Sequence, residues 1–561
     1  MKAIKRVTIV VILQMLMVGI AHGQQFNPPA EAYKACEGKS VGSAAQLINP
    51  SGETISGICE EVNGKLLLRP DRSKGVDREI TPPGQTSGQH YQMKEIPPRK
   101  IELPVGSNKV YVTRAVPDVE SESGLKNKDF KAEAVKVVGG KVALSVDWVP
   151  IFIEEKEPTG LAETDPESSP FGFHPAYTYK SVVDRHRLRE PSEMGYDYSH
   201  PIDMGVVWNR PEYYALWDKI QKNDEDISEG KFDWKETDYV YGSVPKGMRI
   251  MGNIGGIARR TNKEEKPKRR TFTFKSEFYE KNFSIFVKNL VERYDGDGVN
   301  DMPGLKNPVK YWQIENEPDI ATRDWKGYAK LVEAAGKAVK DACFDCKVVM
   351  GGMAAPQALE SFYIPVMREL KGKYVDVFDF HFFGMAGEWV NFQRGYASIR
   401  KALDSNGFPN AEIWITETGT YTGNPRVPVR KLGDQGTMDQ RRLDFKVLST
   451  QSEKQQAAEV VKRYVYALSL GIKKVFWAFG IMEGFSGNDG QFDHTGFIYD
   501  GQYGDNPGRG VKKLSYYTYK LMTEKLGGSD FSNIKQIEIG TGVYAYKFMK
   551  SGRAVYVVWV N

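Results

Sequence analysis

The sequence predicts an α/β protein built around a (β/α)8 barrel, with a small disulfide module before the barrel and β-rich segments on either side of it. Two observations lead to this fold class. Between about residues 169 and 527, short apolar runs alternate with amphipathic stretches of helical period, as in successive βα units. Two of the runs end in Glu317-Pro318 and Glu417-Thr418-Gly419. A strand that ends in a carboxylate and then breaks is expected where a barrel presents side chains at its carboxyl-terminal mouth.

Eight candidate strands fall in this region. They are Phe171–Pro175, Met204–Trp208, Met248–Ile254, Lys310–Asn316, Lys347–Met353, Val375–Phe383, Glu412–Glu417 and Lys473–Phe479. Helices are expected over Phe278–Arg293, Asp324–Ala342, Glu453–Leu470 and Val511–Leu526. This order fits a TIM barrel. The alternative is a doubly wound open sheet, which normally binds its ligand at one switch point and has no need of glutamates ending strands four and seven.

Shorter β segments are expected on both sides of the barrel. Valine-rich runs lie in residues 101–157, after a proline-containing linker over residues 71–100. Alternating runs lie in residues 528–561, over Ile534–Ile539, Tyr544–Met549 and Ala554–Val560. Either the two sets form one β appendage, or the last segment belongs to a unit that the sequence cuts short.

Residues 1–23 have the pattern of a secretory signal peptide. Lys2, Lys5 and Arg6 precede an apolar run over residues 7–20, and small residues suited to cleavage follow it. The run is shorter than the ~20 residues that a membrane span needs. We therefore expect a secreted or periplasmic protein with no membrane attachment after cleavage.

The chain has four cysteines, and in an exported protein these favour disulfides. Cys343 and Cys346 are expected to form a local staple between a helix and strand five, with a redox pair as the alternative.

Cys36 and Cys59 lie in a unit of residues 30–70 that resembles short secreted cysteine modules. Two further cysteine positions of that pattern hold Ala45 and Leu68 here. The resemblance therefore implies that Cys36–Cys59 is the one bridge of the module.

Composition and charge give no reason to expect nucleic acid, a membrane surface or zinc as a partner. The chain has 77 basic and 72 acidic residues, a net charge of +5, which demands neither nucleic acid nor a membrane surface. The 7 histidines show no metal-ligand spacing, so no zinc is expected, and no organic cofactor is implied. Asp295, Asp297 and Asp301 resemble part of a calcium loop, but the distal bidentate glutamate is missing and an ordinary turn is favoured.

The two strand-ending glutamates indicate glycosidic bond cleavage. That reaction needs one carboxylic acid to protonate the departing oxygen and one carboxylate to attack the anomeric carbon. Asn316, directly before Glu317, can direct its amide to the sugar 2-hydroxyl, a contact that strengthens in the transition state. The predicted partner is an oligo- or polysaccharide.

These motifs resemble clan A of the glycoside hydrolases, and within it the family 39 and family 5 types. The resemblance rests on Asn316-Glu317-Pro318 after strand four, on Trp414-Ile415-Thr416-Glu417 in strand seven, and on Trp477 in strand eight. It implies catalysis with retention of configuration, Glu317 as acid/base, Glu417 as nucleophile, and Asn316 as ligand of the 2-hydroxyl. It also implies that Trp477 forms the stacking floor of the subsite that holds the cleaved sugar.

Strand six departs from the clan pattern His-x-Tyr. His381 matches the histidine and is expected to contact the sugar or orient the acid/base, but Phe383 stands where a tyrosine would donate to the nucleophile. Tyr421, after strand seven, is the candidate substitute. His174 and Arg210, which end strands one and two, are further candidates for sugar contact.

Two other functions fit the same residues. A non-catalytic carbohydrate-binding protein on an inactive barrel would account for the lost tyrosine, but it would have no need of Asn316, Glu317 and Glu417 together. A transglycosylase would share every residue and differ only in the access of acceptor and water.

Overall fold

The structure is a computed structural model that describes residues 33–48, 54–62, 65–70, 97–126, 128–158, 165–180, 190–255, 261–263, 270–429, 444–487, 489–502 and 506–561. The predicted signal peptide and most of the predicted linker lie outside these residues. The chain divides into two compact units, Met1–His90 and Tyr91–Asn561, and each is described by itself.

The first unit holds a three-stranded antiparallel sheet in the order β1 (Ala44–Ile48), β2 (Thr54–Val62), β3 (Lys65–Pro70). Cys36 and Cys59 form the disulfide that the resemblance implied. Ala45 and Leu68, at the positions of the missing pair, are buried with this bridge and form the core of the sheet.

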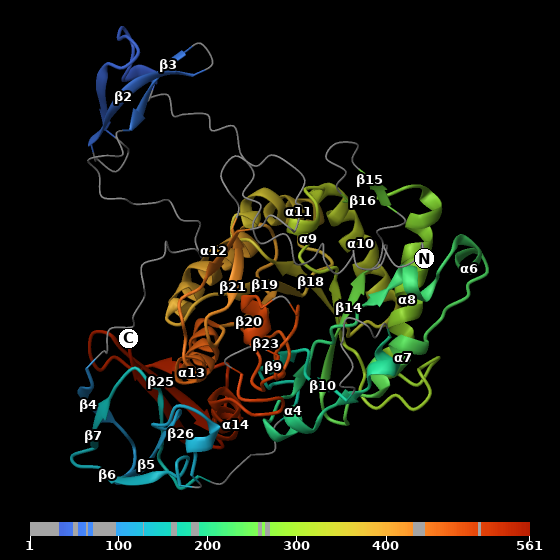
Figure 1. Cartoon of the computed structure of the whole chain (residues 1–561). Helices are drawn as coiled ribbons and strands as arrows, with labels where there is room; N and C mark the ends of the chain where they lie inside the picture. The colour runs from blue at the N-terminus through green and yellow to red at the C-terminus, as the bar shows by residue number, and fades with distance from the viewer. Residues whose placement is uncertain are drawn as a thin grey trace. The chain divides into compact units, whose positions relative to one another are not determined.

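The second unit contains a closed barrel of parallel strands (Figure 1). Its eight strands are β9 (Phe171–His174), β12 (Trp208–Asn209), β14 (Arg249–Gly255), β17 (Tyr311–Ile314), β18 (Lys347–Met353), β19 (Val377–Phe383), β20 (Glu412–Gly419) and β23 (Val475–Ala478). The barrel closes because β12 pairs with both β9 and β14. The TIM-barrel prediction is confirmed.

The predicted second strand was placed too early. Ser199–Asp203 forms helix α4, Met204 caps it, and only Trp208 and Asn209 pair with the neighbouring strands. Apolar residues between a helix end and a two-residue strand gave the sequence the appearance of one longer strand.

Helices surround the barrel strands (Figure 1), among them α8 (Glu277–Tyr294), α10 (Trp325–Ala342), α12 (Phe392–Ser405), α13 (Glu453–Leu470) and α14 (Leu514–Leu526). Local sequence sets their ends. Ser452 and Gln455 form a capping box at the start of α13, and Gly471 ends it with a φ of 103°. Among the described residues, no helix has both the length and the apolar character needed to cross a membrane.

Aromatic and aliphatic side chains pack together in the barrel interior. Trp208 of β12 and Trp414 of β20 lie on strands that are not neighbours, yet their ring centroids are 5.4 Å apart. Phe476 of β23 belongs to the same buried cluster. Side chains alternate between the two faces of a strand. Because Trp208, Trp414 and Phe476 point into the barrel, the residues next to them in a regular strand face the surrounding helices.

Segments from both ends of the second unit form one further sheet, in the order β24 (Lys535–Gln536), β25 (Val543–Lys550), β26 (Arg553–Val560), β8 (Ile151–Glu154), β5 (Lys109–Arg114), β6 (Glu133–Lys136). β4 (Arg99–Pro104) and β7 (Lys141–Val146) pair beside it. The segments of residues 528–561 therefore share one β appendage with the strands that precede the barrel. Trp559 of β26 packs edge-on against Trp389, with ring centroids 5.4 Å apart.

Candidate active site

Glu317 and Glu417 meet at the carboxyl-terminal mouth of the barrel. Glu317 follows β17 in a tight turn in which both Glu315 and Glu317 have left-handed backbone, with φ of 59° and 45°. Such backbone is uncommon outside glycine and concentrates at functional sites. Glu417 lies in β20, and one of its carboxylate oxygens is within 4.8 Å of one of Glu317.

A β-bulge turns Glu417 towards the interior. The register of β19 and β20 shifts between Phe380 and His381, so Thr416 is the extra residue of β20. Trp414 faces the interior, and strict alternation would turn Thr416 inward and Glu417 outward. With the bulge, both Thr416 and Glu417 contact His381.

Arg210 directly follows β12 and is fully buried. Its guanidinium connects β12 with residues of β17 and β20 and with the turn after β17. Its Nη1 donates to Glu417 Oε1 at 2.8 Å, and its Nη2 donates to Asn316 Oδ1 at 2.6 Å. Nε and Nη2 both donate to Gln313 Oε1. The oxygen of Asn316 accepts from Arg210, and the amide group of Asn316 has only its N–H donors to offer a sugar hydroxyl. Arg210, Asn316 and Glu417 thus come together, but Arg210 acts as a scaffold beneath the site.

His174 lies beside the same carboxylate. Its Nδ1 is 2.8 Å from the carbonyl oxygen of Arg210, and its Nε2 is 3.6 Å from Glu417 Oε1. Burial and then the positive charge of Arg210 hold the pKa of His174 well below its usual value. His174 is therefore neutral, with Nδ1–H donating to the carbonyl.

His381 contacts both glutamates through one ring nitrogen. Nδ1 is 2.7 Å from Glu317 Oε1 and 3.5 Å from Glu417 Oε2. Burial alone would lower the pKa of His381, but the carboxylates of Glu417, Asp379 and Glu317 outweigh it and raise the pKa to about 10. The ring is therefore an imidazolium at neutral pH, and Nδ1–H donates towards the glutamates.

The two glutamates occupy different environments. The side chain of Glu417 is 3% exposed and that of Glu317 is 22% exposed. Burial raises the pKa of Glu417, while the cations of His381 and Arg210 oppose this effect. Two carboxyl groups in unlike surroundings can hold different protonation states at one pH, as a reaction with one acid and one nucleophile requires.

Trp477 lies away from this group. Phe476 points into the barrel, so Trp477, the next residue of β23, points to the helices. Its side chain is fully buried against Phe497, and its indole N–H donates to the carbonyl of Thr495 at 2.9 Å. The role of stacking floor that the resemblance implied for Trp477 therefore has no geometric support.

Phe479, the residue after β23, lies beside His174, which itself contacts Glu417. It meets the ring of His174 at a centroid distance of 6.1 Å and stacks on Phe383 at 5.2 Å. It also stacks on Phe485 at 4.2 Å. Phe383 thus belongs to an aromatic wall beside the site.

Tyr421 does not replace the missing tyrosine. Its hydroxyl donates to the carbonyl of Ser449 at 2.9 Å, and the residue is buried. The suggested contact with Glu417 is wrong, because the loop after β20 directs the phenol elsewhere.

Sequence reasoning missed Gln313 and Asp379. Gln313 Nε2 donates to Asp379 Oδ2 at 2.6 Å, and both are fully buried at the base of the site. The available signal was the two-residue period of strands, because Asp379 precedes His381 by two positions and so shares its face.

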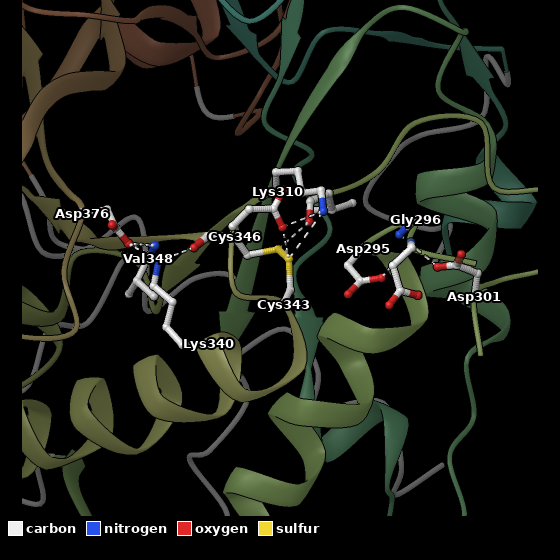
Figure 2. Close-up of a disulfide and its surroundings, with 12 residues drawn as sticks. Asp295, Gly296, Asp301, Lys310, Lys340, Cys343, Cys346, Val348 and Asp376 are labelled. Carbon is white, nitrogen blue, oxygen red and sulfur yellow. Dashed lines mark hydrogen bonds and ion pairs between the residues drawn. A yellow bond between two sulfur atoms is a disulfide. The ribbon is translucent and has the colours of Figure 1, made fainter. Parts of the chain in front are cut away.

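A second polar cluster lies at the opposite, amino-terminal end of the barrel strands (Figure 2). Cys343 and Cys346 form a disulfide between α10 and β18, which confirms the predicted staple. Lys310 Nζ is 3.0 Å from Asp345 Oδ1 and 3.6 Å from Cys343 Sγ.

Three acidic residues after α8, Asp295, Asp297 and Asp301, have oxygens within 4.8 Å of one another (Figure 2). Backbone amides of the same loop already bind them. Gly296 and Gly298 donate to Asp301, and the next amide donates to Asp297. These hydrogen bonds hold the loop as an ordered turn, which is the structure that the sequence favoured. Calcium binding at this loop stays a prediction.

Comparison with known proteins gives similarity of fold. No protein-family model matches the chain, and no curated protein matches it. A family 39 glycoside hydrolase from Bacteroides cellulosilyticus WH2 has a TM-score of 0.50 and 15% identity, with 83% of this chain and 87% of that chain covered. A GH39 β-xylosidase from Caulobacter crescentus has a TM-score of 0.41 and 15% identity, with 70% and 79% covered. The first of these shows that the present chain has the fold of a solved family 39 glycoside hydrolase.

Proposed function

We propose that the protein is an exported, retaining glycoside hydrolase that cleaves a β-linked oligo- or polysaccharide. The observation that carries the proposal is the approach of Glu317 and Glu417 to within 4.8 Å across one barrel mouth. Retaining glycosidases hold their carboxyl groups about 5–5.5 Å apart, whereas inverting ones leave about 6.5–9.5 Å for a water molecule. The short spacing favours direct attack by a carboxylate.

Glu417 acts as the nucleophile, and the positive charges of His381 and Arg210 offset part of the rise that burial causes in its pKa. It attacks the anomeric carbon while Glu317, the more exposed carboxyl, protonates the departing oxygen, so the glycosidic bond breaks as a glycosyl ester forms. Glu317 then takes a proton from water, and the resulting hydroxyl group displaces Glu417. Two inversions at one carbon give net retention. Asn316 donates its amide to the sugar 2-hydroxyl.

Export is part of the proposal. The pattern of residues 1–23 supports it, and so do the disulfides Cys36–Cys59 and Cys343–Cys346, since disulfides persist in oxidising compartments. Amino-terminal sequencing of protein recovered outside the cytoplasm should begin at Gln24.

The decisive experiment uses Glu417→Gly with aryl β-glycosides. The variant should lose at least about 10⁴-fold in kcat, and azide should restore turnover and give the inverted glycosyl azide, because the small anion fills the space of the lost carboxylate. In the wild type, a 2-fluoro glycoside should label Glu417 covalently. Glu412→Gln is the matched control, since Glu412 lies at the far end of the same strand, where it accepts from the Trp414 indole.

Other outcomes distinguish the competing functions. A wild-type protein that binds oligosaccharides without cleaving any glycoside in a panel of xyloside, glucoside, mannoside, galactoside and uronide substrates would be a binding protein. Turnover that yields mainly glycosylated acceptor in place of free sugar would identify a transglycosylase.

A further inference from the structure

A third carboxylate lies directly beneath the two glutamates. Asp379 of β19 is fully buried, and its Oδ2 is 3.5 Å from Nε2 of His381, the ring nitrogen that points away from the glutamates. We propose that Asp379 is a positioning residue that holds His381 as a doubly protonated imidazolium with Nδ1–H directed at Glu317 and Glu417. This inference deepens the proposed glycosidase function and rests on it.

The carboxylate of Asp379 is fixed in place by neutral donors. The backbone N–H of Thr416 donates to Oδ1 at 2.9 Å, and Oδ2 accepts from Thr416 Oγ1 at 2.5 Å and from Gln313 Nε2 at 2.6 Å. These three hydrogen bonds set the orientation of the Asp379 carboxylate. Because all three donors are neutral, none of them cancels its negative charge. That charge therefore acts on the adjacent imidazole ring.

Both ring nitrogens of His381 face acceptors. Nε2 faces Asp379 Oδ2 and, at 3.3 Å, the hydroxyl oxygen of Thr416, whose own hydrogen is donated to Asp379. Nδ1 faces the carboxylates of Glu317 and Glu417. A neutral imidazole would leave one nitrogen lone pair against an acceptor, whereas the imidazolium donates on both sides.

The strand beside this pair keeps it enclosed. A Cβ atom at Gly352 of β18 would lie 2.1 Å from His381 Nε2 and 2.7 Å from Asp379 Oδ2, so only glycine lets the backbone approach this closely. The backbone thus covers the Asp379–His381 contact and keeps the local dielectric low, which strengthens the attraction between the two charges.

The charges that surround His381 come from five elements. Glu317 follows β17, Glu417 lies in β20 and Asp379 in β19, while Arg210 follows β12 and His174 ends β9. His174 is neutral, as its low pKa indicates. Arg210 and an imidazolium at His381 then face three carboxyl groups, and the set is neutral when Glu317 carries the proton that acid catalysis needs. Asp379 supplies the charge that makes this balance possible.

The test replaces Asp379 by asparagine, which keeps the size and removes the charge. With ¹⁵N-labelled histidine, and His381→Gln to assign the signal, the wild type should show an imidazolium at His381 at pH 8, and Asp379→Asn should show a neutral ring. The alkaline limb of kcat/KM should move down by about 1–3 pH units, the size of a lost opposite charge. kcat should fall more than KM rises.

Asp376→Asn is the matched control. Asp376 lies just before the same strand, accepts from the backbone N–H of Val348, and faces Lys340 at the other end of the barrel (Figure 2). It should leave both the ring signal and the pH limb in place.

The inference and the proposed function fail in different ways. A neutral His381 at pH 8 in the wild type, or an unmoved ring signal in Asp379→Asn, would overturn the role of Asp379 whatever the enzyme does, and the wild-type measurement stands even if the variant does not fold. Unchanged turnover of Glu417→Gly would instead overturn the glycosidase itself.

Discussion

Arg210 donates to Glu417 across 2.8 Å, although 207 positions separate the two residues in the chain. Both side chains are almost completely buried, and the same guanidinium binds Asn316. One cation therefore sets the position of the predicted nucleophile and of the predicted ligand of the sugar 2-hydroxyl. Removing one partner of such a buried pair typically costs about 3–5 kcal/mol, because the other charge is left without compensation.

Arg210→Lys should lower kcat/KM by about 10²–10³-fold while the protein still folds. Lysine keeps the charge but cannot present the planar fork that holds Glu417 and Asn316 at once. Initial rates on an aryl β-glycoside and a circular dichroism melt would check both parts. Activity within about threefold of the wild type would show that the fork has no role in positioning the nucleophile.

The raised pKa of His381 predicts a pH-dependent contribution to stability. Its pKa of about 10 in the folded protein lies above the ordinary value of 6.5, so the stabilisation is complete below pH 6.5 and is lost as the pH rises through about 10. The free energy of unfolding of the wild type should therefore fall relative to that of His381→Gln between pH 6.5 and 10. Urea titrations of both proteins over this range measure the difference, and a constant difference would contradict a charged His381.

Asn316→Ala should reveal which hydroxyl the amide binds. The contact strengthens in the transition state, so the variant should lose about 10²-fold or more in kcat on an ordinary glycoside. On the matching 2-deoxy glycoside, which lacks the partner, wild type and variant should differ by less than about threefold. Equal losses on both substrates would place the role of Asn316 in holding Arg210.

Substitution of Phe479 should affect substrate binding, whereas substitution of Trp477 should affect the stability of the fold. Phe479→Leu should raise KM about 5–10-fold, because a flat ring beside His174 is lost from the mouth. Trp477→Phe should leave KM within about twofold and lower the free energy of unfolding by about 1–3 kcal/mol, since its ring packs in the outer core. A larger effect on KM from Trp477→Phe than from Phe479→Leu would reverse the assignment.

The sequence predicted the barrel, and the position of Glu317 and Glu417 at its mouth, because both depend on local patterns. Seven of the eight strands were located to within a few residues, since apolar runs and their breakers mark strand ends directly. The second strand was misplaced because only Trp208 and Asn209 pair, which is too short a run to show any period.

The inward face of the site could be predicted only in part. The alternation of side chains along a strand places Asp379 on the same face as His381, and it directs Trp477 away from the barrel interior. The motif resemblance instead implied that Trp477 faces the sugar, and this implication is not supported by the structure. The bulge at Thr416 could not be foreseen, because an extra residue in β20 is defined by its register against β19 and leaves no mark in the sequence.

The two disulfides should differ in what they stabilise. Cys36–Cys59 closes a loop with a sequence separation of 23, worth about 3 kcal/mol in the chain-entropy model, and it is buried together with Ala45 and Leu68. The Cys36→Ser, Cys59→Ser double variant should therefore make residues 33–70 sensitive to limited proteolysis while glycoside turnover is unchanged.

Cys343–Cys346 spans a separation of only 3, for which the same model gives about 2 kcal/mol, and it lies within the large hydrophobic core of the barrel unit. The Cys343→Ser, Cys346→Ser double variant should lower the melting temperature of the barrel, measured by calorimetry, and leave the proteolysis of residues 33–70 as in the wild type. Loss of activity without a change in melting temperature would contradict a purely structural staple, because the disulfide lies at the amino-terminal end of the strands and the glutamates at the other.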